Sequence, residues 1–310
     1  MFATQDNVGE PYTAILKVID NEGAFDTDEV VITVLQVPPT AVLANNGPVS
    51  EHSTATVSFS NQADVSTADL AAGFTYSYDF DNDGTFEVIG TTEATAAVPA
   101  SLLDDGPGAR TVRGRILDKD GAFTDYLTSI EILNVAPTAS LTNSGPVVEG
   151  STATVTLANQ ADASRADTTT GFTYSFDFDQ DGVFDVVNSL VATATVPASY
   201  LDDGPATRSV GARITDKDGG FTDYATTIEI FNAAPSLVIR GAASVQEGAV
   251  YTLGLSATDP GADTISSWSI DWGDGTVETV LGNPASVTHT YADGANSYTI
   301  RASATDEDGT

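Results

Sequence analysis

The residues best suited to chemistry are aspartates that alternate with other residues and end in glycine. The pattern occurs twice, as Asp79, Asp81, Asp83 and Gly84 and as Asp177, Asp179, Asp181 and Gly182. Carboxylates two residues apart can surround a hard cation such as calcium with oxygen ligands. The same residue types also supply the backbone geometry of a tight β-hairpin turn. The sequence leaves both interpretations open, a calcium loop and a turn without metal.

An EF-hand is excluded by the residue at the end of each loop. That family needs a glutamate at the twelfth loop position, where Gly90 and Asn188 stand. A third, related stretch has Gly273 in place of one aspartate, which weakens the case for a metal there.

Further acidic residues recur along the chain and are candidate metal ligands. They are Glu51 and Glu149, Asp104 and Asp202, Asp118 and Asp120, and Asp216 and Asp218. In an immunoglobulin-like strand order, the Glu51 loop, the Asp104 loop and the Asp-rich hairpin should share the pole that faces the next unit. The Asp118-type turn should lie at the opposite pole. Crowded carboxylates at a joint repel unless cations lie between them, so we expect interdomain calcium that stiffens the chain. The alternative is that these acids point into solvent.

The elements that position these residues repeat at a spacing of 98 residues, seen in Pro39, Pro137 and Pro235. Roughly two-thirds of residues 39–136 are identical at 137–234. A period this long exceeds that of solenoid repeats, so each copy should be a complete small domain. We expect a preceding unit's C-terminal part at 1–38, complete units at 39–136 and 137–234, and a unit at 235–310 that lacks its last strand. Such a chain is a window onto a longer array, or a subunit with an incomplete final domain.

Alternation of apolar and polar residues predicts strands throughout. Tyr76, Tyr78 and Phe80 share one face of a strand, with Ser77 and Asp79 on the other. Helical periodicity is absent, apart from a single turn predicted at 99–103. The fold class is therefore all-β, with tandem immunoglobulin-like sandwiches arranged like beads on a string.

The last unit resembles a known family. It carries Trp268-Ser269-Ile270-Asp271-Trp272-Gly273-Asp274-Gly275-Thr276, then His289-Thr290-Tyr291 and Tyr298-Thr299-Ile300-Arg301-Ala302, with Glu247-Gly248 near its start. This pattern resembles the PKD (polycystic kidney disease) domain, an immunoglobulin-like sandwich. The two preceding units look like divergent relatives with longer insertions at 62–73 and 160–171. The resemblance implies extracellular adhesive, structural or spacer modules, sometimes appended to secreted hydrolases, and does not imply catalysis.

Composition restricts the partners. The net charge of −33 excludes nucleic acid and anionic membrane surfaces, which require Lys and Arg. No apolar run is long enough to insert in a membrane, and no signal peptide is visible at the start. Cysteine is absent, so neither disulfides nor thiolate metal sites contribute.

Catalysis is not expected. Of the two histidines, His52 aligns with Gly150 in the next unit, and His289 lies in a strand-like stretch where a structural role is expected. Paired carboxylates of a glycosidase need a substrate cleft, which small sandwiches in series rarely supply.

We therefore expect a non-enzymatic structural or adhesive array, secreted or on the cell surface, that acts as a calcium-stiffened spacer or stalk. Its partners would be other repeat units, extracellular matrix, polysaccharide or copies of itself. One alternative is a set of accessory binding modules of a secreted polysaccharide- or protein-degrading enzyme, with Tyr126 and Tyr224 as the exposed aromatics to test. Another is a filament subunit that assembles by strand complementation, with the strand at 29–34 as donor.

Overall fold

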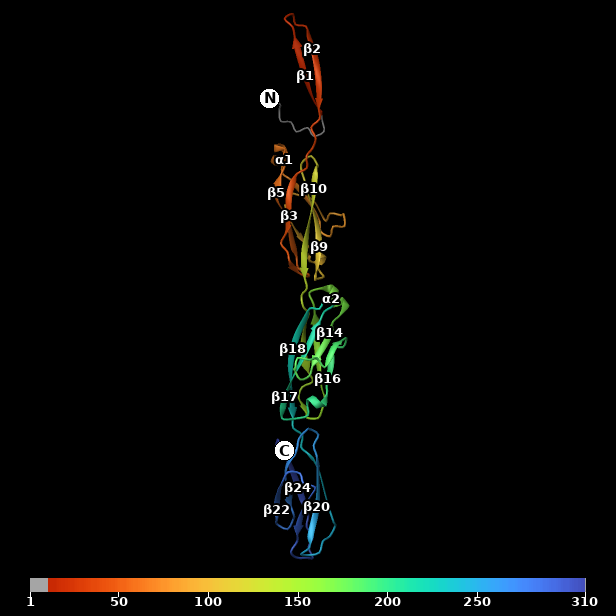
Figure 1. Cartoon of the computed structure of the whole chain (residues 1–310), viewed down its shortest axis with the longest axis vertical. Coiled ribbons are helices and arrows are strands. Elements are labelled where there is room, and N and C mark those ends of the chain that lie inside the picture. The colour runs from red at the N-terminus through yellow and green to blue at the C-terminus, as the bar shows by residue number, and fades with distance from the viewer. Residues whose placement is uncertain (1–10, 310) are drawn as a thin grey trace. The chain divides into compact units, whose positions relative to one another are not determined.

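A computed structural model describes residues 11–309, and its elements are mainly β-strands (Figure 1). No helix among these residues is long and apolar enough to cross a membrane. The chain divides into two compact units. The first unit consists of the chain up to Val135 together with the later segment Asp162–Thr170. The second unit consists of Ala136–Ala161 and the chain from Gly171 onward.

The first described element is an antiparallel hairpin of β1 (Tyr12–Ile19) and β2 (Phe25–Ile32). It lies in the segment predicted to be the end of a preceding unit, of which residues 1–10 are outside the described part. Its turn is organised by Asp20, whose Oδ1 accepts the N–H groups of Glu22 and Ala24, each at 2.9 Å.

Residues 40–133 form a sandwich of two sheets. The smaller sheet has the order β3-β5-β8, with β3 (Thr40–Asn45), β5 (Ala55–Ala63) and β8 (Thr95–Val98). The larger has the order β4-β10-β9-β6-β7, with β4 (Val49–Ser50), β10 (Phe123–Leu133), β9 (Gly108–Leu117), β6 (Thr75–Asp79) and β7 (Val88–Thr91).

The core of this sandwich comes from the alternating positions. Tyr76, Tyr78 and Phe80 are 5%, 0% and 3% exposed, as their spacing predicts. However, Ser77 and Asp79 on the other face of β6 are also buried, at 4% and 0% exposed, so the alternation does not separate a buried face from a solvated one. The reason is that the chain after β6 packs on this face: Ser77 Oγ accepts the N–H of Gly90 at 3.1 Å, and the Asp79 carboxylate accepts N–H groups of the following loop.

The same topology is repeated 98 residues later. The smaller sheet contains β11 (Thr138–Asn143), β13 (Ala153–Ala161) and β16 (Thr193–Val196). The larger has the order β12-β18-β17-β14-β15, with β12 (Val147–Val148), β18 (Phe221–Phe231), β17 (Ala206–Thr215), β14 (Thr173–Asp177) and β15 (Val186–Ser189).

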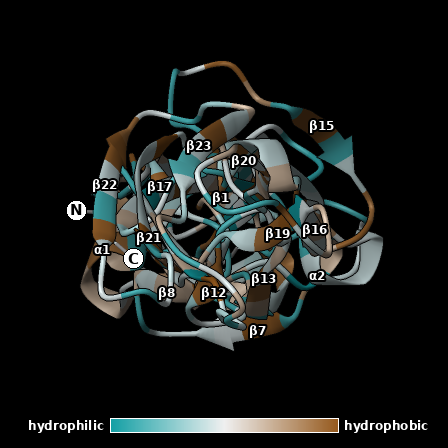
Figure 2. Ribbon diagram, turned by 90° about the horizontal axis from the view of Figure 1, so that it is seen from below, coloured by the Kyte–Doolittle hydropathy of each residue, from teal (hydrophilic) through white to brown (hydrophobic). Residues whose placement is uncertain are grey.

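Residues 236–306 form a third sandwich with two three-stranded sheets. One contains β19 (Ser236–Gly241), β20 (Val250–Thr258) and β23 (Ser286–Thr290). The other contains β22 (Val277–Leu281), β21 (Ile265–Asp271) and β24 (Arg301–Asp306). Figure 2 shows hydrophobic and hydrophilic residues interleaved along the strands. The fold class predicted from the sequence, all-β with β-sandwich modules in tandem, is confirmed.

Short helices occur where the sequence analysis expected none. They are α1 (Thr67–Ala72) and α2 (Arg165–Thr170), both within the predicted insertions. The Ser66 hydroxyl caps α1 by accepting the N–H of Asp69 at 3.3 Å. Each helix has only six residues, too few to show an amphipathic stripe, so periodicity could not reveal it. The single turn predicted at 99–103 is present as the 3-10 helix η1 (Ala100–Leu102), and η2 (Ala198–Tyr200) is its copy.

Candidate cation sites

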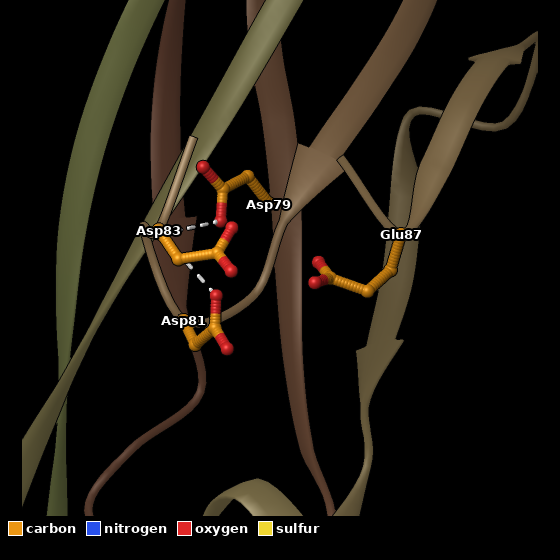
Figure 3. A group of neighbouring side chains, drawn as sticks. All are labelled: Asp79, Asp81, Asp83 and Glu87. Atoms are coloured by element: carbon orange, nitrogen blue, oxygen red, sulfur yellow. Dashed lines mark hydrogen bonds between the residues drawn. The ribbon is translucent and has the colours of Figure 1, made fainter. Parts of the chain in front are cut away.

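The first acidic loop connects β6 to the edge strand β7. Asp79, the last residue of β6, is fully buried, whereas Asp83 and Glu87 are exposed. Carboxylate oxygens of Asp79, Asp81, Asp83 and Glu87 all lie within 4.8 Å of one another (Figure 3). Glu87 precedes β7 directly and was not among the predicted ligands. Its position, ninth in the loop counted from Asp79, was the signal that could have identified it.

Backbone N–H groups also converge on these carboxylates. Asp79 accepts the N–H of Gly84 at 3.0 Å through Oδ2 and that of Asp83 at 3.2 Å through Oδ1. Glu87 Oε2 accepts the N–H of Phe80 at 2.7 Å. Gly84 has a φ of +100°, which a residue with a Cβ rarely adopts. These bonds are what a turn needs, and they leave further carboxylate lone pairs for a cation.

The second loop connects β14 to β15 in the same way. Asp177 is 7% exposed, and its Oδ2 accepts the N–H of Gly182 at 3.0 Å. Asp185 Oδ2 accepts the N–H of Phe178 at 2.7 Å, and its Oδ1 accepts the hydroxyl of Tyr200 at 2.6 Å. That hydrogen bond, with the charges of the neighbouring carboxylates, raises the pKa of Tyr200 to about 12.

In the third sandwich, the turn that corresponds to these loops follows β21 and is held by aromatic side chains. Trp272 is fully buried and stacks on His289 with ring centroids 4.6 Å apart. His289 Nε2 lies 2.7 Å from Asp274 Oδ2, and this hydrogen bond lowers the pKa of Asp274. A Cβ on Gly273 would lie 2.7 Å from the carbonyl oxygen of Thr299, so this tight turn has no room for the second aspartate of the motif. His289 has the structural surroundings that the sequence analysis expected.

Glu51 lies at the end of the first sandwich where β9 begins. It is 2% exposed, and its two oxygens accept the N–H groups of Gly106 and Val135, each at 2.9 Å. Burial raises its pKa, and the two N–H bonds oppose that shift. Carboxylate oxygens of Glu51, Asp105 and Asp167 lie within 4.8 Å of one another, inside the first compact unit.

Glu149 repeats this arrangement inside the second compact unit. It is 1% exposed and accepts the N–H groups of Gly204 at 2.9 Å and Ala233 at 2.7 Å. Its carboxylate lies within 4.8 Å of those of Asp259 and Asp263, which precede β21. Burial, and then the charges of Glu149 and Asp259, raise the pKa of Asp263 to about 7. Asp259 and Asp263 each keep a buried Oδ2 without a hydrogen-bond partner among the described residues.

The remaining predicted ligands near this pole have other partners. The carboxylate of Asp104 lies 2.7 Å from His52 Nδ1. Asp202 contributes its backbone carbonyl, which accepts the N–H of Ala262 at 2.6 Å.

The predicted turn at Asp118 lies after the end of β9, whereas the Glu51 contact at Gly106 lies before its start, so the two occupy opposite ends of the strand, as expected. Asp118 Oδ1 accepts the N–H groups of Asp120 at 2.9 Å and Ala122 at 3.0 Å. Asp216 repeats these bonds with Asp218 and Gly220, at 2.9 and 2.8 Å. Asp120 is paired with Lys119 and Asp218 with Lys217. Asp118 also lies within 4.8 Å of Asp64 and Asp69, two acids of the insertion that the sequence analysis did not propose.

The hairpin aspartates do not join the Glu51 group, contrary to the expectation of one shared pole. Asp79 pairs with Arg113, midway along the ten residues of β9, because β6 has only five residues. The loop therefore starts well before the end of the sandwich and collects Glu87 instead. The structure thus separates loop groups within a sandwich from groups at its ends.

The architecture defines the described chain as a series of β-sandwich modules. Residues 232–310 match the family model of the PKD domain, which confirms the resemblance for that module. No curated protein matches the chain. Solved structures that are similar include fibronectin(III)-like modules of Clostridium thermocellum CbhA, with 14% identity, a TM-score of 0.25, and coverage of 62% of this chain and 95% of that one. The chicken CNTN1 FN1-FN3 domains show 13% identity, a TM-score of 0.24, and coverage of 86% and 92%.

Proposed function

We propose that this chain is a non-enzymatic, extracellular spacer whose consecutive β-sandwich modules are joined by calcium. The PKD match supports the extracellular location, since such domains are typically found there. The acidic composition suits a cationic partner rather than nucleic acid.

The observation that carries the proposal is the group formed by Glu149, Asp259 and Asp263. One carboxylate comes from the 137–234 repeat and two from the PKD module, all within 4.8 Å. Burial, and then the negative charges of Glu149 and Asp259, disfavour ionisation of Asp263 and raise its pKa to about 7 in the absence of a cation. A calcium ion would replace that proton and bind both modules through oxygen ligands.

The alternative of sugar- or fibre-binding accessory modules depended on exposed aromatic residues. Tyr126 and Tyr224 are half-buried, and each hydroxyl oxygen already accepts a hydrogen bond within its own sandwich. Tyr126 accepts the N–H of Ala41 at 2.9 Å, and Tyr224 that of Ala139 at 2.8 Å. Both rings pack against the cores of their sandwiches, which favours a structural role.

Calorimetry and small-angle scattering of the whole chain, in calcium and in chelator, test the proposal. We expect heat of binding with a Kd on the order of 10⁻⁴–10⁻³ M, as for other extracellular modules. We also expect calcium to narrow the distribution of end-to-end lengths of the chain that scattering detects. The double variant Asp259→Asn/Asp263→Asn should lose one binding event and part of that narrowing.

The matched control is Glu131→Gln/Glu229→Gln, which removes the same charge from exposed positions on β10 and β18. Calcium heats and scattering that are the same in the double variant, the control and the parent would refute calcium at this joint.

A further inference from the structure

The carboxylate of Asp177 has an oxygen that the protein leaves unused. Asp177 is 7% exposed at the end of β14, between β15 and β17. Its Oδ2 accepts the N–H of Gly182, so the carboxylate faces the loop. Its Oδ1 is buried and has no hydrogen-bond partner among the described residues. A buried polar atom without a partner is costly, and its presence points to a missing ligand.

The loop that Asp177 faces carries oxygen donors at the spacing of a calcium loop. Counted from Asp177, acids occupy the first, third, fifth and ninth positions, as Asp177, Asp179, Asp181 and Asp185. Glycine stands sixth, where Gly182 has a φ of +90°. The calcium loop of an EF-hand uses side chains at the first, third and fifth positions, a backbone carbonyl at the seventh, and a side chain at the ninth that often binds through a water. Glycine stands at the sixth position for the turn.

The first sandwich shows that these four positions converge. In its copy of the loop, the carboxylate oxygens of Asp79, Asp81, Asp83 and Glu87 lie within 4.8 Å of one another (Figure 3). Four negative charges at that distance repel strongly unless a cation lies among them.

The two copies differ in the strand alongside. Arg113 is the β9 residue in register with Asp79, whereas Gly211 of β17 is in register with Asp177. A cationic side chain is therefore replaced by glycine next to the second loop. In the first loop Asp79 Oδ1 also accepts the N–H of Asp83, a bond that Asp177 Oδ1 lacks. The second loop is consequently the better cation site.

We propose that the loop from Asp177 to Asp185 binds a calcium ion within one module, through four carboxylates and without the glutamate that completes an EF-hand. The ion ties the end of β14 to the start of β15. The loop from Asp79 to Glu87 is a weaker copy of the same site. This site is independent of the calcium proposed at the joints, because it uses none of the same residues.

Tyrosine-sensitised terbium luminescence of the whole chain tests the site. Terbium(III) takes oxygen ligands as calcium does, and the Tyr200 hydroxyl lies 2.6 Å from Asp185 Oδ1, close enough to sensitise a bound ion. We expect terbium emission that millimolar calcium displaces and equal magnesium displaces less. Tyr200→Phe should lower the emission several-fold while the number of calcium sites measured by calorimetry stays the same.

The decisive variant is Asp179→Asn/Asp181→Asn, which keeps oxygen acceptors for the turn and removes two charges. It should lose the Tyr200-dependent emission and one calcium site. The equivalent Asp81→Asn/Asp83→Asn in the first loop should cause a smaller loss, and Glu131→Gln/Glu229→Gln should cause none. Circular dichroism confirms that each variant is folded.

Calcium stoichiometry and emission of the Asp179→Asn/Asp181→Asn protein equal to those of the parent would overturn the proposal and leave the loop a turn. Loss of sites in the Asp259→Asn/Asp263→Asn protein with loop emission intact would support both proposals. If the loop emission is present and Asp259→Asn/Asp263→Asn does not change the number of calcium sites, this proposal stands and the calcium proposed at the joint is refuted.

Discussion

At the scale of single residues, the same glutamate is used at the end of both repeats to hold two backbone segments. Glu51 joins the loop at Gly106 to the chain just after β10, at Val135. Glu149 makes the same two bonds to Gly204 and Ala233. The carboxylate accepts the two N–H groups with its two separate oxygens, whereas a glutamine of the same size has only one acceptor oxygen. These glutamates are therefore structural, and at the same time they place a negative charge at the joint.

Replacing Glu51 with Gln should destabilise the first sandwich by about 1–3 kcal/mol, because the amide NH₂ group faces a buried N–H donor and leaves it unpaired. Urea unfolding of the whole chain, followed by far-ultraviolet circular dichroism, should show an earlier first transition. Glu131→Gln, an exposed change of the same kind on β10, is the control. If the free energy of unfolding of Glu51→Gln equals that of the control, the structural role of the two Glu51 hydrogen bonds is contradicted.

At the scale of elements, the two repeats fill the space between their sheets with different pairs of residues. In the first, Gly114 of β9 faces Phe59 of β5, and a Cβ on Gly114 would lie 2.7 Å from Cζ of that ring. In the second, the equivalent residues are Ala212 and Leu157, both buried at 2% and 1% exposed. The larger ring is thus paired with glycine and the smaller side chain with alanine, so the volume between the sheets is conserved.

This pairing predicts a compensated double substitution. Gly114→Ala alone should destabilise the first sandwich by about 1–3 kcal/mol, because the new methyl group clashes with Phe59. Adding Phe59→Leu should recover most of that loss by reproducing the pair found in the second repeat. Calorimetric unfolding of the parent, both single variants and the double variant measures the coupling. Additive effects of the two changes would show that the residues do not share this space.

At the scale of the whole molecule, the net charge of −33 means that carboxylates greatly outnumber basic side chains. Some carboxylates are paired with a basic side chain. Arg115, for example, donates hydrogen bonds to Asp125 and thereby lowers the pKa of Asp125. At others, burial and then the charges of neighbouring carboxylates raise the pKa, as at Asp263. The second kind makes stability depend on pH, because the folded chain binds a proton there more tightly than the unfolded chain does.

The raised pKa of Asp263 predicts the sign of one pH effect. A carboxyl whose folded pKa is about 7 binds a proton more tightly in the folded chain than in the unfolded one. Its contribution to stability is therefore present at low pH and is lost as the pH rises through about 7. In chelator, the stability of Asp263→Asn relative to the parent should therefore increase as the pH rises from about 4 to about 7, and should stay constant above that. In calcium the parent should be the more stable protein.

Tryptophan fluorescence measures this effect selectively, because both tryptophans, Trp268 and Trp272, lie buried in the PKD module that contains Asp263. Thermal unfolding of the parent and the variant should be followed by this signal across the pH range. A difference in midpoint that stays constant with pH would contradict the assignment of the shift to Asp263.

Strand positions and the aromatic core were predictable because they depend on period and identity along the chain. Tyr78 and Phe80 are buried as their alternation predicts, and the turns at Asp118 and Asp216 form where Asp and Gly stand. The hairpin aspartates were likewise recognisable as a candidate loop. The helices α1 and α2 were not, since six residues carry no periodic signal.

The sequence by itself determined that this protein is a tandem array of acidic β-sandwiches with two copies of an Asp-rich loop, because these features are written in local spacing and in the 98-residue repeat. Only the tertiary structure decided which acids meet. It brought Glu87 to Asp79 across a hairpin and Asp263 to Glu149 across more than a hundred residues. It also showed that Asp79 and Asp177 are buried, although they lie on the face of the strand opposite the aromatic core residues. Such groupings depend on sheet order and strand length, which set the distances between residues far apart in the chain.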